Sequence, residues 1–350
     1  MQSFRGSYAN RGSGAQRASS DARARRVLFF SCKYVLLVTL EQLAMIFIFI
    51  GAGFFFGKRK MLPGDTGTAL SRLILNLFIP CMSFISVARN FSLENFRIYA
   101  VILAAGAVVL LLTAPLSLLV EKRFKGTAIE KMTAGYSMVL PNYGYIGYPL
   151  VLAVFGQEAL AMFVIFALPF NFYFGLVTVP QWSWDEKKGR KWKILNILTP
   201  TTVSVLLGIL WGALSIPIPS LLGNVCDAAA DCVLVTTMLV TGLAIARIPL
   251  KKLFSEKRAY GIALVRLILL PAVFIAAAFG ICKVFRLDST LLVTLGAFTA
   301  MPLGMNPVVL AEMQGKDGLF GAECALVSLI LSVVTLPAVF TLLSYLAGLL

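Results

Sequence analysis

Residues 140–149 have the sequence Leu-Pro-Asn-Tyr-Gly-Tyr-Ile-Gly-Tyr-Pro, in the middle of a long apolar run. Each proline lacks a backbone N–H and clashes with the preceding turn, so a helix through this run is expected to break. Residues 301–307, Met-Pro-Leu-Gly-Met-Asn-Pro, bring the same ingredients to a second apolar run. Backbone groups freed in lipid must be covered by protein or line a polar cavity. Two broken helices in matching positions predict a substrate site near the membrane midplane; two unrelated proline kinks are the alternative.

The composition around these segments is that of a membrane protein. Hydrophobic residues make up 59% of the 350 and charged residues 13%, whereas soluble domains carry about 25% charged residues. The net charge of +15 comes from short basic clusters between apolar runs rather than from one polar face, so nucleic-acid binding is not expected. The chain has no histidine and its six cysteines have no CxxC spacing, so no metal site, cofactor or catalytic residue is predicted.

Ten apolar runs are long enough to cross a bilayer, which takes about 20 residues per helix. The runs are 35–57, 67–88, 99–120, 132–155, 159–179, 198–216, 221–246, 260–282, 290–311 and 322–349. They predict an all-α polytopic membrane protein with a first five-helix repeat over 35–180, a cytoplasmic connecting loop over 181–197 and a second five-helix repeat over 198–350. Residues 1–34, rich in Arg, Ser and Gly, predict a basic disordered tail. A transit peptide or a wrongly assigned start codon has the same composition.

The loops predict the orientation, because short cytoplasmic loops accumulate Lys and Arg. One set of loops carries 18 of these residues and the opposite set, without the tail, carries 4. The basic set lies at 58–60, 122–131, 187–193, 247–258 and 316. Both termini are therefore expected to face away from the cytoplasm. Five spans in each half give two repeats of opposite orientation, with the fourth and ninth helices broken.

Several short motifs resemble the auxin efflux carrier family. They are Pro141-Asn142, Gly147, Pro149, Phe155-Gly156, Pro302 and Asn306, together with Gly57-Lys58, Asn76–Pro80 and Thr241-Gly242. The resemblance covers about 35–348 and implies ten helices in two inverted repeats, a scaffold part and a transport part, and a crossing of the fourth and ninth helices. It implies that Pro141 and Pro302 break the helices and that Asn142 lies beside the substrate, with Gly144, Gly147 and Asn306 in the same binding motifs. Plant members export auxin, and microbial members are linked to carboxylates such as malate.

Three charged residues inside the apolar runs are further candidates, because a charge near the bilayer centre costs at least about 2.5–3.5 kcal/mol. Asp227 and Asp231 stand four apart on one helical face and predict a proton or cation site for coupling. A structural role in a wet outer mouth is the alternative. Arg266 is able to attract an anion or to extend to the headgroups, and the second interpretation is favoured.

These features predict a secondary transporter that moves a small organic anion, such as a carboxylate or an auxin-like acid, by alternating access in the plasma membrane. Amide side chains and helix N-termini suit a carboxylate. A sodium-coupled organic-anion symporter of the bile-acid type is the alternative within transport. A membrane-embedded enzyme is disfavoured by the absence of histidine and of GxSxG or P-loop motifs, and a sensor by the absence of a signalling domain. The expected partners are the anion and the lipid bilayer; coupling to protons or sodium and a homodimer stay open.

Overall fold

The computed structural model describes residues 9–182, 198–247, 256–312 and 315–350, with side chains from residue 32 onward. Throughout these ranges the chain forms helices joined by short loops, without a strand. This confirms the all-α class. The predicted connecting loop at 181–197 and the basic residues at 187–193 lie outside the described residues, apart from two residues at the start of the loop.

The helices follow one another with few long connections. In chain order they are α1 (Ala9–Lys58), α2 (Thr66–Leu73), η1 (Ile74–Phe78), α3 (Ile79–Asn90), α4 (Phe96–Arg123), α5 (Ala128–Val139), η2 (Tyr143–Gly147), α6 (Tyr148–Tyr173), η3 (Phe174–Thr178), α7 (Val179–Trp182), α8 (Pro200–Ala213), α9 (Ser220–Ala246), α10 (Lys257–Leu264), η5 (Val265–Leu269), α11 (Leu270–Phe285), α12 (Thr290–Ala300), α13 (Asn306–Glu312) and α14 (Leu319–Ala347). The η elements are single π-helical turns within longer helices.

Seven helical stretches of the described chain are long and apolar enough to cross a membrane. They are Cys32–Lys58, Thr66–Asn90, Phe96–Arg123, Tyr143–Trp182, Ser220–Ala246, Lys257–Phe285 and Leu319–Ala347. Leu111, Leu221 and Val334 point outward with 71%, 76% and 73% of their surface exposed. Helices with an apolar outer face suit lipid rather than water. The chain is therefore a multi-pass integral membrane protein.

The number seven differs from the ten spans predicted for a physical reason. α6 and its extensions run through two of the predicted spans without a loop between them, although Gly156 inside α6 is non-helical, with φ 86° and ψ −176°. In addition α5, α8, α12 and α13 are each shorter than 18 residues, and a helix needs about 20 residues to cross the hydrocarbon core by itself.

Prolines determine where the long helices widen. Each of the four described π-helical turns ends two residues before a proline, namely Pro80, Pro149, Pro180 and Pro271. A proline has no N–H to donate and its ring clashes with the carbonyl four residues earlier. A wider turn relieves that clash: before Pro271, the N–H of Leu270 bonds the carbonyl of Val265, five residues back.

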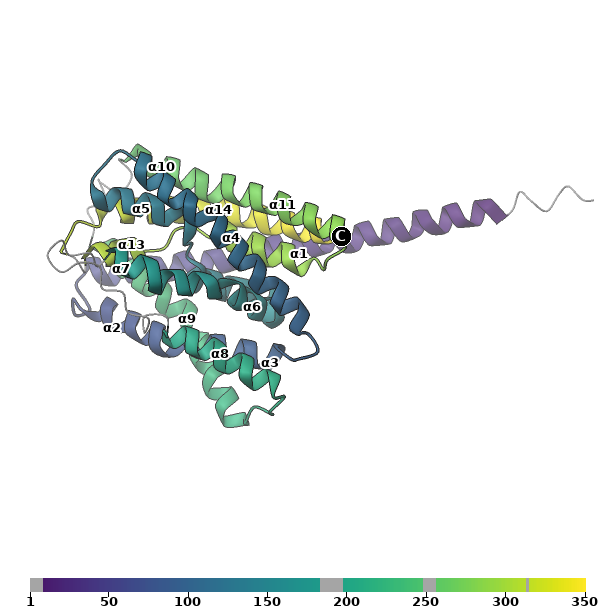
Figure 1. The fold of residues 1–350 in the computed structure, drawn as a ribbon, viewed down its shortest axis with the longest axis horizontal. Helices are drawn as coiled ribbons and strands as arrows, with labels where there is room; N and C mark the ends of the chain where they lie inside the picture. Colours follow the sequence, from purple (N-terminus) through teal and green to yellow (C-terminus); the bar gives the residue numbers. More distant parts are fainter. Residues whose placement is uncertain (1–8, 183–197, 248–255, 313–314) are drawn as a thin grey trace, which may run out of the picture.

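Contacts between helices divide the bundle into two groups, and in Figure 1 α2, α3, α8 and α9 lie below α5, α10, α11 and α14. The first group consists of α1, α2, α3, α8 and α9, and the second of α4, α5, α6, α10, α11, α12 and α14. Glycines allow close packing within the first group: a Cβ on Gly242 of α9 would lie 2.1 Å from the carbonyl oxygen of Ile50 in α1. The groups meet where α1 packs on α14 and α3 packs on α6.

The basic connections gather at one end of the bundle. The starts of α2, α5 and α10 lie at this end, and the ends of α3 and α11 and the C-terminus lie at the other (Figure 1). Side chains link the basic loops: Arg258 donates to the carbonyl of Lys125 at 2.6 Å, and Arg247 donates to the carbonyl of Gly64.

Helix α1 begins at Ala9 and therefore extends into the basic tail that the sequence predicts over 1–34. Residues 22–26, Ala-Arg-Ala-Arg-Arg, are strong helix formers, and no proline separates them from the first span. The helical path of the span therefore continues backward into the tail.

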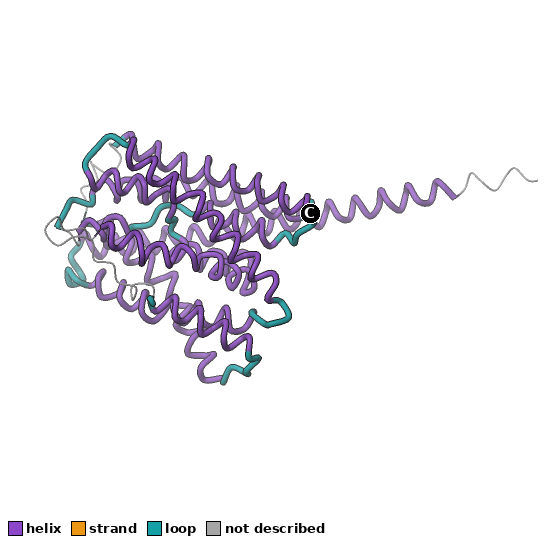
Figure 2. Tube along the Cα trace, in the orientation of Figure 1, coloured by secondary structure: helices purple, strands orange, loops and turns teal. Residues whose placement is uncertain are grey.

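Two non-helical segments lie inside the bundle, in addition to the loops at its ends (Figure 2). One covers residues 140–142, between α5 and η2, and the other covers residues 301–305, between α12 and α13. Each of these two interruptions contains a proline, Pro141 and Pro302 respectively. These two interruptions form the candidate functional site.

Candidate functional site at the two interruptions

The first interruption begins where Pro141 offers no N–H to the last turn of α5. α5 ends at Val139, and Asn142 takes the non-helical angles φ −79° and ψ 54°. With its backbone turned out of the helix, Asn142 donates its N–H to the carbonyl oxygen of Pro302 over 2.8 Å. One proline-containing segment is thus hydrogen-bonded directly to the other.

The second interruption is longer and is held by α14. α12 ends at Ala300, and the N–H of Leu303 donates to the hydroxyl of Ser328 in α14 over 3.0 Å. Gly304 lies against the first interruption, where an added Cβ would be 3.0 Å from the Cγ of Asn142. The absence of a side chain at Gly304 leaves the space that the Asn142 carboxamide occupies.

The two asparagines of the motifs have different surroundings. The side chain of Asn142 is partly exposed and makes no hydrogen bond to the described residues. Asn306, at the start of α13, donates from Nδ2 to the hydroxyl of Tyr136 in α5 over 3.0 Å. The structure therefore brings Pro141, Asn142 and Pro302 together, whereas Asn306 contacts the first interruption through the helix before it.

The glycines of the first motif lie in η2, beyond the interruption. An added Cβ on Gly147 would lie 3.0 Å from the ring of Phe163 and 3.5 Å from Cγ of Met301. Gly144 faces Ile79 of the neighbouring helix group at 3.7 Å. Gly147 therefore permits close packing against the second interruption, and Gly144 lies where the two helix groups meet.

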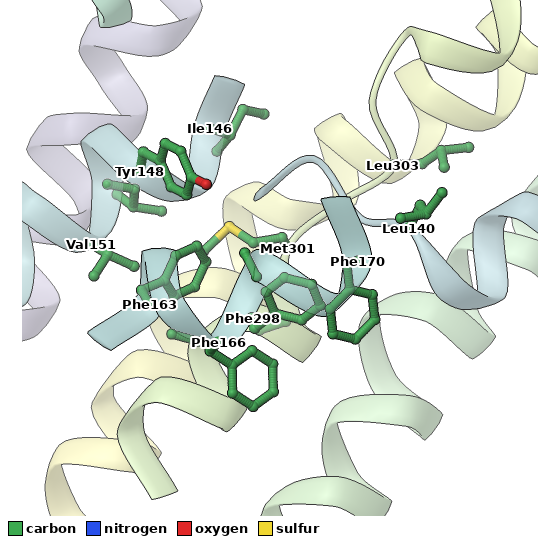
Figure 3. Packing of buried hydrophobic residues seen from close by; sticks show 14 of the residues in the cluster. Leu140, Ile146, Tyr148, Val151, Phe163, Phe166, Phe170, Phe298, Met301 and Leu303 are labelled. Carbon is green, nitrogen blue, oxygen red and sulfur yellow. The ribbon is translucent and has the colours of Figure 1, made fainter. Parts of the chain in front are cut away.

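A cluster of aromatic rings lies beside the crossing, the place where residues 140–142 meet residues 301–305 (Figure 3). Phe298, near the end of α12, has its ring centroid 4.4 Å from that of Phe170, 5.0 Å from that of Phe166 and 5.7 Å from that of Phe163. Tyr143 stacks on Phe298 from η2 with centroids 5.4 Å apart. Because these rings are buried, they form a dry wall that fixes the end of α12 against α6.

Arg266 corrects the expectation that it extends to the headgroups. Its side chain is 2% exposed, and its guanidinium donates to the carbonyls of Met301 at 3.2 Å, Phe298 at 3.4 Å and Met138 at 3.5 Å. It points inward because the π-helical turn η5 places it toward the ends of α5 and α12. The sequence placed Arg266 inside a span, but it did not indicate which helices Arg266 faces.

Comparison with known sequences identifies the family. The family described as "Membrane transport protein" matches residues 38–177 and 187–340. The chain belongs to the auxin efflux carrier family. It is similar to an uncharacterized transporter of Methanothermobacter thermautotrophicus, 22% identical over 300 residues, which are 85% of this chain and 96% of that relative. Family membership makes the chain a membrane transporter.

The two aspartates expected to couple ions lie away from the interruptions of this transporter. Asp227 forms a two-pronged ion pair with Arg89, with both N–O distances 2.8 Å and the side chains 41% and 39% exposed. Asp231 is exposed. α9 reaches η2 at Thr237, whose hydroxyl lies 3.3 Å from the carbonyl of Tyr145. Asp231 and Asp227 lie about 9 and 15 Å before Thr237 along the helix axis. They do not form a dry pair, because Asp231 is exposed and Asp227, itself 41% exposed, is paired with Arg89.

The transporter has two described cavities at the end opposite the basic loops. A cavity of about 440 Å³ lies beside the Asp227 ion pair and is lined by Arg89, Trp211 and Asn224 among others. The other, of about 420 Å³, lies between residues 94–102, at the start of α4, and residues 285–291. Neither is lined by residues of the two interruptions.

Sequence analysis missed two polar features of the transporter. Glu323 in α14 is only 5% exposed, although it lies within an apolar run. Tyr143 donates its hydroxyl to Oδ1 of Asn171 over 2.6 Å, joining η2 to the last turns of α6. An acid and an amide inside apolar runs were the available signals, since such residues are costly in lipid.

Proposed function

We propose that this transporter carries a small organic anion, such as a carboxylate, by alternating access, and that it binds the anion where residues 140–142 meet residues 301–305. The observation that carries the proposal is the hydrogen bond from Asn142 to Pro302, which joins two interrupted helices. Beside it, the Asn142 carboxamide is partly exposed and unbonded among the described residues. The side-chain N–H of Asn142, on a backbone fixed by the bond to Pro302, is a suitable donor to a carboxylate.

We also propose that the chain crosses the membrane ten times, in two inverted five-helix repeats. In this arrangement Gly156 divides α6, and α5 and α12 each form one span with the helix that follows their interruption. Gly156 and Gly315 support the repeat, since each follows the interruption of its half and each has a positive φ, 86° and 65° respectively. Odd-numbered repeats give the two halves opposite orientations.

The two helix groups suggest how access alternates. The group of α1, α2, α3, α8 and α9 contains no interruption that lies in the crossing, and its glycine contacts make it a compact scaffold. The second group carries both interruptions and moves against it. The interfaces between α1 and α14 and between α3 and α6 are then the sliding surfaces.

A cysteine test checks the orientation, in a background where the six native cysteines are replaced. Lys122→Cys at the basic end is expected to be protected from an impermeant thiol reagent in intact cells, and Glu158→Cys at the opposite end is expected to react. Both positions are exposed, so burial does not explain a difference. The reverse pattern would contradict the proposed orientation and placement in the plasma membrane.

Transport in proteoliposomes checks the substrate class. We expect uptake of labelled malate to be competed by other small carboxylates and not by their neutral amides. Proton and sodium gradients applied separately distinguish proton coupling, sodium coupling and uncoupled transport. Competition by neutral amides equal to that by carboxylates would contradict an anion carrier.

A further inference from the structure

Arg266 is a buried cation at the crossing that has no carboxylate partner among the described residues. It is 2% exposed, and all three of its described hydrogen bonds go to backbone carbonyls. A buried charge needs compensation, because the cost of leaving water is several kcal/mol. The compensation at Arg266 has to come from these carbonyls.

The interruptions remove the regular donor, four residues on, from two of the three carbonyls; Phe298 keeps only a longer bond from the N–H of Met301 at 3.4 Å. The regular donor for Phe298 would be the N–H of residue 302, which is a proline. The regular donor for Met138 would be Asn142, whose N–H is bonded to Pro302 instead. The carbonyl of Met301 lies in the non-helical segment itself. Arg266 therefore supplies the missing donors at the ends of both interrupted helices.

The charge of Arg266 matches in size the combined partial charge of the two helix ends that it contacts. The C-terminal end of a helix carries about −0.5 elementary charge, so the ends of α5 and α12 together carry about −1. One guanidinium, with a charge of +1 and a planar set of donors, balances them. Without it, two negative helix ends would face the position proposed for the substrate, and they would repel an anion.

We infer that Arg266 is the positioning and specificity-determining residue of this site: it holds the ends of α5 and α12 together and gives the crossing its preference for anions. The inference rests on the proposed function for its second half only. Arg266 reaches the site through Met301, the neighbour of the residue that Asn142 contacts. Its role is therefore to orient the two segments and set the local potential rather than to react.

The test compares Arg266→Lys and Arg266→Gln with Arg72→Gln as the matched control. Arg72 is also an arginine within a membrane-crossing stretch, but it is exposed. The first measurement is thermal unfolding of each purified full-length protein, which needs no substrate. Arg266→Gln is expected to lower the unfolding temperature by several degrees, Arg266→Lys by less, and Arg72→Gln hardly at all.

The second measurement is the KM for labelled malate in proteoliposomes. Arg266→Gln is expected to raise KM at least about tenfold, equal to a loss of about 1.4 kcal/mol, while Arg266→Lys, which keeps the charge, stays within about threefold. Equal unfolding temperatures for Arg266→Gln and Arg72→Gln would overturn the tie between α5 and α12. Equal KM for the Lys and Gln variants would overturn the charge role. If even the unchanged protein transports no carboxylate, the proposed function fails, and the unfolding measurement still decides the tie.

Discussion

The two interruptions contain the same residue types but use them differently. At the first, Asn142 directly follows Pro141, spends its backbone N–H on Pro302 and leaves its carboxamide unbonded among the described residues. At the second, five residues pass without helix, the backbone of Pro302 accepts that bond, and Asn306 is held by Tyr136. The first interruption thus presents a side chain, and the second presents a backbone.

This difference shows that a similar motif does not assign the same role to each of its residues. An amide that already donates to a neighbouring hydroxyl must exchange that bond to hold a substrate, so its net contribution is small. An unbonded amide gains its full interaction with the substrate. We therefore assign substrate contact to Asn142 and a structural link between the two halves to Asn306.

The largest expected effect follows from this assignment. Asn142→Ala is expected to lower the uptake of labelled malate at least about tenfold, because the hydrogen bond lost to a charged group is worth roughly 1.5–3 kcal/mol. Folding and insertion are expected to be unaffected, since the Asn142 side chain makes no described hydrogen bond. Uptake and the amount of protein in the membrane are measured together.

Two further variants sharpen that comparison. Asn306→Ala removes the bond to Tyr136 and is expected to reduce uptake by at most about fivefold, since a neutral hydrogen bond contributes about 1 kcal/mol. Gly304→Ala keeps Asn142 but crowds its Cγ, and it is expected to reduce uptake as Asn142→Ala does. Normal uptake by Asn142→Ala would place substrate contact elsewhere and leave the interruption with a structural role.

The glycines after the interruptions provide a second comparison, in stability. Neither Gly156 nor Gly315 has an atom within 4 Å of an added Cβ, so only backbone strain distinguishes them. Gly156, with φ 86° and ψ −176°, lies in a region open essentially to glycine alone, and Gly156→Ala is expected to cost about 3 kcal/mol. Gly315, with φ 65°, is left-handed, and Gly315→Ala is expected to cost about 1 kcal/mol. Thermal unfolding of both variants checks the order, and equal shifts would contradict it.

The starts of the two interrupted helices also differ. α5 is capped by Thr127 and Glu130 and is tied to α10 by Arg258, which bonds both Glu130 and Glu256 at 2.8 Å. α12 has no side-chain cap at its N-cap residue Ser289, and near its start the Asp288 carboxylate accepts from the N–H of Thr290 at 2.7 Å.

Hydrogen bonds from the side chain and backbone of Arg258 lower the pKa of Glu256 to about 2. The unfolded pKa is about 4.3, so this contribution to stability is complete above that pH and is lost as the pH falls toward 2. At pH 7 the Glu256→Gln variant is therefore expected to be less stable than the unchanged protein by less than about 1 kcal/mol, seen as a slightly lower unfolding temperature. Below pH 4 the two unfolding temperatures are expected to approach each other. A difference that grows in acid would contradict this assignment.

The sequence predicted the apolar helices well because length and composition determine them. The run at 221–246 matches α9 (Ser220–Ala246), and the run at 99–120 lies within α4 (Phe96–Arg123). The interruptions could also be anticipated, since proline removes a specific donor wherever it occurs. The start of α1 at Ala9 could not be predicted, because composition indicates little burial but does not exclude a helix that continues from a span.

The site was predicted only as far as local sequence reaches. Pro141 and Pro302 gave the positions of the interruptions, but the contacts that distinguish Asn142 from Asn306 come from residues far along the chain. Arg266 is 128 residues from Met138 and 35 from Met301. Helical periodicity places a residue on a face, but it does not say which helix that face meets.

The smallest expected effect concerns the acids of α9, which the sequence suggested as a coupling site. Asp231 is exposed and Asp227 is paired with Arg89, and both lie away from the two interruptions. Asp231→Asn is expected to leave both malate exchange and its dependence on a pH gradient within about twofold, and the exposed Asp227 ion pair contributes less than about 1 kcal/mol.

Glu323→Gln is the informative comparison, because a carboxylate that is 5% exposed within the moving group changes its solvation if the group moves. We expect Glu323→Gln to alter the dependence on a pH gradient more than Asp231→Asn does, with exchange between equal pools retained. Loss of the pH dependence in Asp231→Asn alone would return the coupling site to α9 and would separate it from both interruptions.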